Sequence, residues 1–272
     1  MQLTDFSKRL IATAIASSLL ILLFSFAFTF LGKWLLFLTV AVLVIVGGYE
    51  YVTFAKKKEI SIFFPLLAIG SFFVLLSFFT ASFSPLWPIV VTLFSFMAIH
   101  LQNPKGSLVD LAVSSFPLFY IAVPMGMLLS ILFHPLQPGL GMSFVLYLLF
   151  VTKGTDVGAY LGGKLLGKHK LIPKVSPGKT VEGTLCGVTF TVLISFFFMK
   201  WTLLPLGSWN WLWLGILFAI VSQFGDLVES LLKRDVGMKD SNALPGFGGV
   251  LDMIDSLLCT TPLLYLIQGL LA

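Results

Sequence analysis

Long apolar runs alternate along the chain with short polar segments. Runs of about 20 mostly apolar residues are long enough to cross a bilayer as helices. Nine such runs are predicted to be membrane-spanning helices, at residues 10–31, 34–55, 60–82, 85–101, 108–133, 141–162, 180–200, 210–232 and 250–271. The fourth run is short, and the fifth contains Pro117 and Pro124, where we expect a kink. The pattern predicts an all-α polytopic membrane protein of about nine helices.

Composition supports this fold class. Of the 272 residues, 58% are hydrophobic and 11% are charged, whereas a soluble domain carries about 25% charged residues. The mean hydropathy is +1.02. Cys186 and Cys259 lie within apolar runs, far apart and without metal-ligand spacing, so both are interpreted as small packing residues.

The basic residues predict the orientation in the membrane. The net charge of +5 is not gathered into a basic arm or patch, so no nucleic-acid partner is expected. Of the 17 Lys and Arg residues, fourteen fall on one side of the predicted membrane, Lys33 and Lys200 on the other, and Lys153 within a span. Cytoplasmic loops carry the excess of positive charge. We therefore expect a multi-pass protein of the plasma or inner membrane, with the N-terminus cytoplasmic and the C-terminus outside.

Acidic residues divide the chain into two halves. Eight of the 12 Asp and Glu residues lie between Asp156 and Asp255. We predict a transmembrane scaffold of about five helices over residues 1–140. A catalytic region of about four helices, with cytoplasmic loops rich in Lys and Gly, is predicted over residues 141–272.

A polar loop precedes the seventh predicted span. Ser176 followed by Pro177 favours a helix start, because Ser caps a helix and Pro fits its first turn. Free N–H groups there, beside Lys179, would suit a phosphate. An ion pair between Lys179 and Glu182, three residues apart, is an equally good interpretation.

Carboxylates at the last two spans favour a cation site. Asp226 and Lys233 share one face of the eighth span, while Asp252 and Asp255 are three apart at the start of the ninth. A carboxylate within a membrane costs about 2.5–3.5 kcal/mol and is tolerated where it faces a cavity, an ion or a partner. Acids in a first turn are also ordinary caps, which is the simpler interpretation for Asp255. Oxygen ligands without His or Cys favour Mg²⁺, as one or two ions.

The segment from Ser230 to Asp255 resembles the signature of the phosphatidate cytidylyltransferases. The matching residues are Ser230, Leu232-Lys233-Arg234, Lys239-Asp240, Pro245-Gly246, Gly248-Gly249, Asp252 and Asp255. Asp156 to Tyr160 and Ser176 to Gly183 also resemble that family, in the expected order. Three residues depart from its pattern: Phe247 stands for histidine, Met253 for arginine, and Gly178 where lysine is common.

The resemblance implies the reaction of CTP with phosphatidate to give CDP-diacylglycerol and pyrophosphate. As a hypothesis, Asp226, Asp252 and Asp255 hold the cation, with Asp226, Lys233, Asp252, Asp255 and Lys179 as the catalytic set. Lys179, Lys233 and Lys239 would bind phosphates, and Ser176 and Thr180 would orient them. Asp156 and Glu182 would support the ligands or hold a second ion. The substrates come from the membrane lipid and the cytoplasm, and Gly and Ala in the spans would permit a homodimer.

Two other functions are compatible with the sequence. A CTP-dependent lipid kinase, or a cytidylyltransferase acting on another lipid phosphate, would use a similar site. An ion-coupled transporter would use intramembrane acids as a coupling site, but it predicts inverted repeats, and no repeat is seen.

Overall fold

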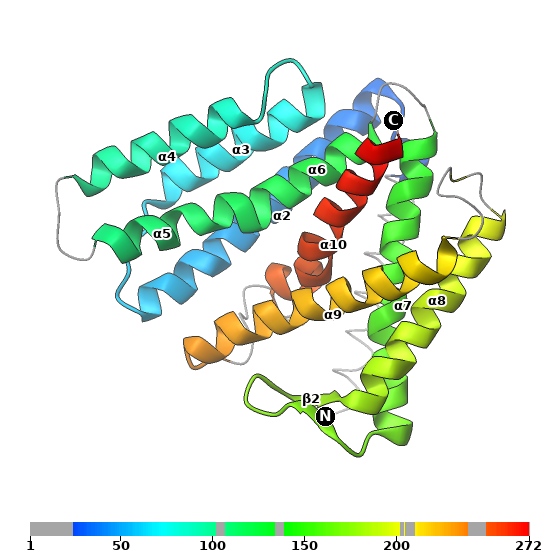
Figure 1. Cartoon of the computed structure of the whole chain (residues 1–272). Helices are drawn as coiled ribbons and strands as arrows, with labels where there is room; N and C mark the ends of the chain where they lie inside the picture. Colours follow the sequence, from blue (N-terminus) through cyan, green and yellow to red (C-terminus); the bar gives the residue numbers. More distant parts are fainter. Residues whose placement is uncertain are drawn as a thin grey trace, which may run out of the picture.

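The structure, a computed structural model, describes residues 24–101, 107–133, 139–201, 204, 210–238 and 249–271. Most of them are helical (Figure 1). The helices are α2 (Phe30–Lys57), α3 (Phe64–Thr80), α4 (Leu86–His100), α5 (Ser107–Pro117), the π-helix η1 (Leu118–Ala122), α6 (Val123–Leu132), α7 (Leu140–Leu166), α8 (Val181–Trp201), α9 (Trp211–Asp235) and α10 (Val250–Leu271).

The predicted fold class, an all-α polytopic membrane protein, is confirmed. Within the described residues, six helical segments are long and apolar enough to cross a membrane: α2, the continuous run Ser107–Leu132, α7, α8, α9 and α10. The predicted third and fourth spans form α3 and α4, which are apolar but shorter. Most of the predicted first span, residues 10–31, lies outside the described residues.

The irregularity expected at the two prolines of the fifth span takes the form of a π-helical turn. Pro117 ends α5 and Pro124 lies in the first turn of α6, with η1 between them. A proline removes a backbone donor and its ring clashes with the preceding turn. The wider π-helical turn accommodates the lost hydrogen bond and the proline ring within one continuous helical run.

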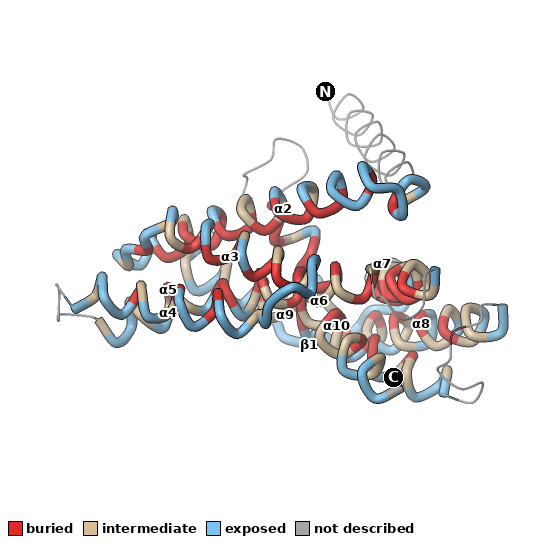
Figure 2. The backbone as a smooth tube through the Cα atoms, turned by 90° about the horizontal axis from the view of Figure 1, so that it is seen from above, coloured by how far each residue is buried: buried red, intermediate tan, exposed pale blue. Residues whose placement is uncertain are grey.

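Helix α10 joins two hydrophobic cores. One core gathers α2, α3, α4, η1 and α6, and it includes Leu251 and Leu258 of α10. The other gathers α7, α9 and the end of α6, and it includes Leu257 and Leu264 of α10. In Figure 1 α10 accordingly lies between the group α2–α6 and the group α7–α9. Figure 2 shows buried residues on the inward faces of the helices and exposed ones on the outward faces.

Glycines bring α7 and α8 into close contact. A Cβ added to Gly162 would lie 2.3 Å from the Cβ of Cys186, and one added to Gly158 would lie 2.7 Å from that of Phe190. Small residues allow helix backbones to approach in this way. The interpretation of Cys186 as a packing residue is consistent with this contact. Gly158 and Gly162 thus serve the packing of two helices of the same chain.

The prediction that Ser176 and Pro177 begin a helix is wrong. They lie in strand β2 (Ser176–Thr180), which pairs antiparallel with β1 (Lys170–Ile172), as the lower part of Figure 1 shows. The fixed φ of proline suits an extended edge strand as well as a first helical turn, and pairing with β1 decides between them. Helix α8 begins at Val181, and the Thr180 hydroxyl accepts a hydrogen bond from the Gly183 N–H at 3.1 Å, as an N-cap does.

Candidate active site

A pocket of about 460 Å³ lies where α7, β2, α8 and α9 meet. Five of the predicted site residues line it: Asp156, Ser176, Lys179, Thr180 and Asp226. The other lining residues are Ala159, Tyr160, Gly163, Lys164, Gly178, Gly183, Thr184 and Gln223. Residues from four elements, spread along the chain from Asp156 to Asp226, thus face one space.

Lys179 and Asp226 form the central ion pair of this pocket. Their Nζ and Oδ2 atoms are 2.6 Å apart, and their side chains are 21% and 32% exposed. Lys179 Nζ also donates to the carbonyl of Gln223 at 3.3 Å. On α7, Lys153 pairs with Asp156 at 3.6 Å, where the side chains are 50% and 37% exposed. We call Lys153, Asp156, Lys179 and Asp226 the open cluster.

The alternative of an ion pair between Lys179 and Glu182 is wrong, because β2 aims Lys179 at α9. Glu182 does not line the pocket. Its carboxylate accepts hydrogen bonds from the backbone N–H groups of Lys168 at 3.0 Å and His169 at 3.1 Å, and contacts His169 Nδ1 at 2.6 Å. Glu182 therefore fastens the start of the hairpin to α8.

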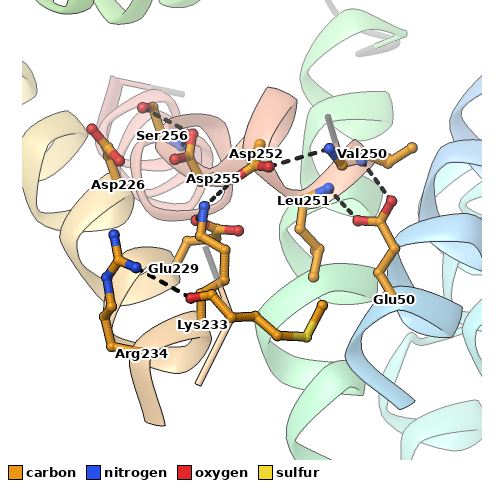
Figure 3. Close-up of polar contacts among 12 residues, drawn as sticks. Glu50, Asp226, Glu229, Lys233, Arg234, Val250, Leu251, Asp252, Asp255 and Ser256 are labelled. Atoms are coloured by element: carbon orange, nitrogen blue, oxygen red, sulfur yellow. Dashed lines mark hydrogen bonds and ion pairs between the residues drawn. The ribbon is translucent and has the colours of Figure 1, made fainter. Parts of the chain in front are cut away.

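A second cluster lies between α9 and α10. Lys233 Nζ contacts Glu229 Oε2 at 2.6 Å and also forms an ion pair with Asp252 (Figure 3). Glu229 is 1% exposed and the Lys233 side chain 11%. We call Glu229, Lys233 and Asp252 the buried cluster. Glu229 is absent from the predicted site, although its spacing of four from Lys233 on one helix face is a signal that could have included it.

Asp255 lies between the two clusters. It is 5% exposed, and its Oδ1 accepts hydrogen bonds from the N–H of Ser256 at 2.6 Å and from its hydroxyl at 3.3 Å. The backbone of Asp255 packs against Gly225 of α9, where an added Cβ would lie 2.7 Å from the Asp255 carbonyl oxygen. This contact places Asp255 beside the turn of α9 that carries Asp226.

The structure divides the predicted cation ligands. Asp226 belongs to the open cluster with Asp255 beside it, whereas Asp252 is paired with Lys233. Among the described residues, no group of three or more His, Cys, Asp or Glu side chains is arranged to hold one ion. Mg²⁺ commonly binds through one or two carboxylates and completes its shell with water and phosphate oxygens. Asp226 and Asp255 could supply two such carboxylates, although the charge of Asp226 is already balanced by Lys179.

Several predicted residues fall outside the described part. Lys239, a predicted phosphate ligand, and Phe247 both lie there.

Gly178 lines the pocket, and a Cβ added to it would meet no atom within 4 Å. Met253 replaces the family arginine, but its carbonyl oxygen accepts a hydrogen bond from Lys153 Nζ at 3.2 Å. This contact ties α7 to the first turns of α10.

Known proteins similar to this chain include phosphatidate cytidylyltransferases of several bacteria. The sequence model of the cytidylyltransferase family matches residues 12–271. A phosphatidate cytidylyltransferase of Chlamydia pneumoniae is 34% identical over 289 residues, which cover 96% of this chain and 91% of that protein. One from Chlamydia muridarum is 31% identical over 97% of this chain and 93% of its own length. One from Bacillus subtilis is 43% identical over 131 residues, 48% of this chain and 49% of that protein.

Proposed function

The chain belongs to the cytidylyltransferase family, and we propose that its pocket is where a cytidylyl group passes from CTP to phosphatidate. The observation that carries this assignment of the site is the Lys179–Asp226 pair, which is open to the pocket. An accessible lysine can exchange its carboxylate partner for a phosphate. The products are CDP-diacylglycerol and pyrophosphate, so the enzyme is a nucleotidyltransferase of phospholipid biosynthesis.

The reaction is a displacement at the α-phosphorus of CTP. A phosphate oxygen of phosphatidate forms the new bond to that phosphorus, the bond to the bridging oxygen of the β-phosphate breaks, and pyrophosphate leaves with the electron pair. The attacking phosphate is already an anion near neutral pH, so no strong base is required. Catalysis then consists of holding two anions together and neutralising the leaving group.

Basic side chains at the pocket are placed for this task. Lys179 and Lys164 line it, and preorganised cations stabilise charge that develops on phosphate oxygens. Ser176 and Thr180 flank Lys179 on β2 and can orient a phosphate by hydrogen bonds. Lys239 is proposed as a further phosphate ligand, and Lys233, held by Glu229 and Asp252, as the residue that joins α9 to α10.

The proposed Mg²⁺ would be held by Asp226 and Asp255, with Asp156 as the neighbouring acid. Bound there, the ion would neutralise the phosphate charges of CTP. The Asp226 carboxylate contacts Lys179 through Oδ2, and its second oxygen could accept the ion. Asp252 is assigned to the buried cluster, where it fixes Lys233, or to a second ion.

One assay tests the activity and the metal together. Purified protein is incubated with phosphatidate, Mg²⁺ and CTP labelled at the α-phosphate, with and without a chelator. We expect labelled CDP-diacylglycerol that disappears with the chelator and returns with excess Mg²⁺. Lipid label from γ-labelled CTP instead would establish a kinase, and full activity in the chelator would remove Mg²⁺ from the proposal.

We also propose the finer topology. Nine spans would place the N-terminus in the cytoplasm, the C-terminus outside and the hairpin with its pocket on the cytoplasmic face of the plasma or inner membrane. The bias of Lys and Arg supports this orientation. Membrane-impermeant labelling of single cysteines placed at Lys170 and Lys200 should mark opposite sides. Crosslinking in the membrane tests the proposed homodimer.

A further inference from the structure

A buried carboxylate of the scaffold contacts the backbone of the site helix. Glu50 of α2 is 1% exposed. Its Oε1 accepts a hydrogen bond from the N–H of Val250 at 2.8 Å, and its Oε2 accepts one from the N–H of Leu251 at 2.9 Å. Figure 3 shows Glu50 reaching from α2 to the first turn of α10. The partners are 200 residues apart in the chain.

Helix α10 has no N-cap side chain of its own, and Glu50 supplies acceptors from α2. The first N–H groups of a helix have no partner within the helix, and a Ser, Thr, Asp or Asn before it usually supplies one. Here Gly249 stands before Val250 and has no side chain. Asp252 Oδ2 accepts a hydrogen bond from the Gly249 N–H at 3.2 Å, and Glu50 takes the next two donors.

Packing beside Glu50 fixes the same turn. The side chain of Leu251 lies against Gly47, one turn earlier on α2, where an added Cβ would be 3.3 Å from Leu251 Cδ2. Leu251 is fully buried. The hydrogen bonds set the position of the α10 terminus, and the Leu251 contact sets its rotation. Both act on the turn that carries Asp252 and leads to Asp255.

We propose that Glu50 is a positioning residue for cytidylyl transfer: it holds the first turn of α10 so that Asp252 and Asp255 face α9 in the working arrangement. The inference rests on the proposed function for its activity readout. It assigns Glu50 no contact with substrate, because Glu50 does not line the pocket. The charge matters as well as the shape, because a carboxylate at a helix N-terminus is stabilised by the helix dipole.

The test compares Glu50→Gln with Glu50→Asp and with a control, Glu59→Gln, which makes the same change at an exposed position just after α2. Glutamine fills the same space, but it has only one side-chain oxygen. Its NH₂ group would face one of the two backbone N–H groups that Glu50 accepts from, and two donors cannot form a hydrogen bond. We expect Glu50→Gln to lower kcat about 100-fold, the scale of a small misplacement of reacting groups. The KM for CTP should change only a few-fold, because no described α10 residue lines the pocket.

Two further readouts separate positioning from general stability. Glu50→Asp keeps the charge and should recover part of kcat, while Glu59→Gln should behave as the wild type. Hydrogen exchange in the peptide that starts α10 should be faster in Glu50→Gln and unchanged in Glu59→Gln. Wild-type kcat per folded Glu50→Gln enzyme, or a fall in folded protein that accounts for the whole loss, would overturn the proposal.

Failure of the proposed function is distinguishable from failure of this inference. If the wild type makes no CDP-diacylglycerol, the assignment of the reaction is overturned, and the exchange measurement still reports the cap. If hydrogen exchange at the start of α10 is unchanged in Glu50→Gln, the proposed capping by Glu50 is overturned, whatever activity the wild type has.

Discussion

Two lysine–carboxylate clusters share helix α9, and their surroundings differ. In the open cluster, Lys179 and Asp226 are 21% and 32% exposed and face a pocket. In the buried cluster, Lys233 is 11% exposed and Glu229 1%. The first pair comes from β2 and α9, whereas the second cluster joins α9 to α10.

The difference in burial indicates a difference in role. Charges that touch water can exchange partners, because solvent compensates the lost contact. Buried charges cannot exchange partners in this way, because removing one member of a buried ion pair leaves the other charge unpaired, at a cost of several kcal/mol. The open cluster is therefore suited to bind and release phosphates, and the buried cluster to hold α9 and α10 at a fixed spacing.

The largest effect should follow from Asp226→Asn. This change keeps the shape of the open cluster but removes the charge proposed to bind the cation and to hold Lys179. We expect turnover to fall about 1000-fold, as for the loss of a main electrostatic group, with a normal melting temperature. The α-labelled CTP assay measures it, with Asp110→Asn on α5 as a control. Normal product formation by Asp226→Asn would refute the assignment.

Lys233→Met should act on stability as well as activity. It leaves Glu229 buried beside Asp252 without a cation, which we expect to destabilise the fold by about 3–5 kcal/mol. The double variant Lys233→Met, Glu229→Leu should regain most of that loss and stay inactive. Thermal unfolding in detergent measures the first effect. A Lys233→Met protein as stable as the wild type would contradict the distinction between the clusters.

Glu182→Gln probes how the hairpin supports the open cluster. The neutral side chain holds the N–H groups of Lys168 and His169 less firmly, so β2 and Lys179 should be less well placed. We expect the KM for CTP to rise a few-fold with kcat little changed, the pattern of lost ground-state binding. A fall in kcat without a change in KM would instead place Glu182 among the reacting groups.

The smallest effect should come from Lys58→Met. Lys58 Nζ contacts Asp235 Oδ1 at 2.9 Å, but the two side chains are 43% and 65% exposed. Pairs of this kind contribute about 0–1 kcal/mol and are screened by salt. Unfolding of this variant at low and high ionic strength should differ little from that of the wild type. A loss as large as that of Lys233→Met would show that exposure does not separate the clusters.

Much of the fold could be predicted from the sequence. The apolar runs predict helices because a bilayer requires backbone groups to be paired within the segment, and α2, α7, α8, α9 and α10 lie close to their predicted bounds. Asp226 could be singled out because a charge within an apolar span requires a reason, and Lys179 because it lies in a polar loop beside a span. These inferences need only local composition and spacing.

The tertiary structure decided which charges meet. Pairing with β1 makes Ser176 part of a strand, packing of β2 on α9 gives Lys179 to Asp226 rather than to Glu182, and contact of α2 with α10 gives Glu50 its role. Hydropathy and helical spacing report on neighbours within a few turns. An ion pair or a cap across 200 residues depends on how separate helices pack, and no local pattern carries that information.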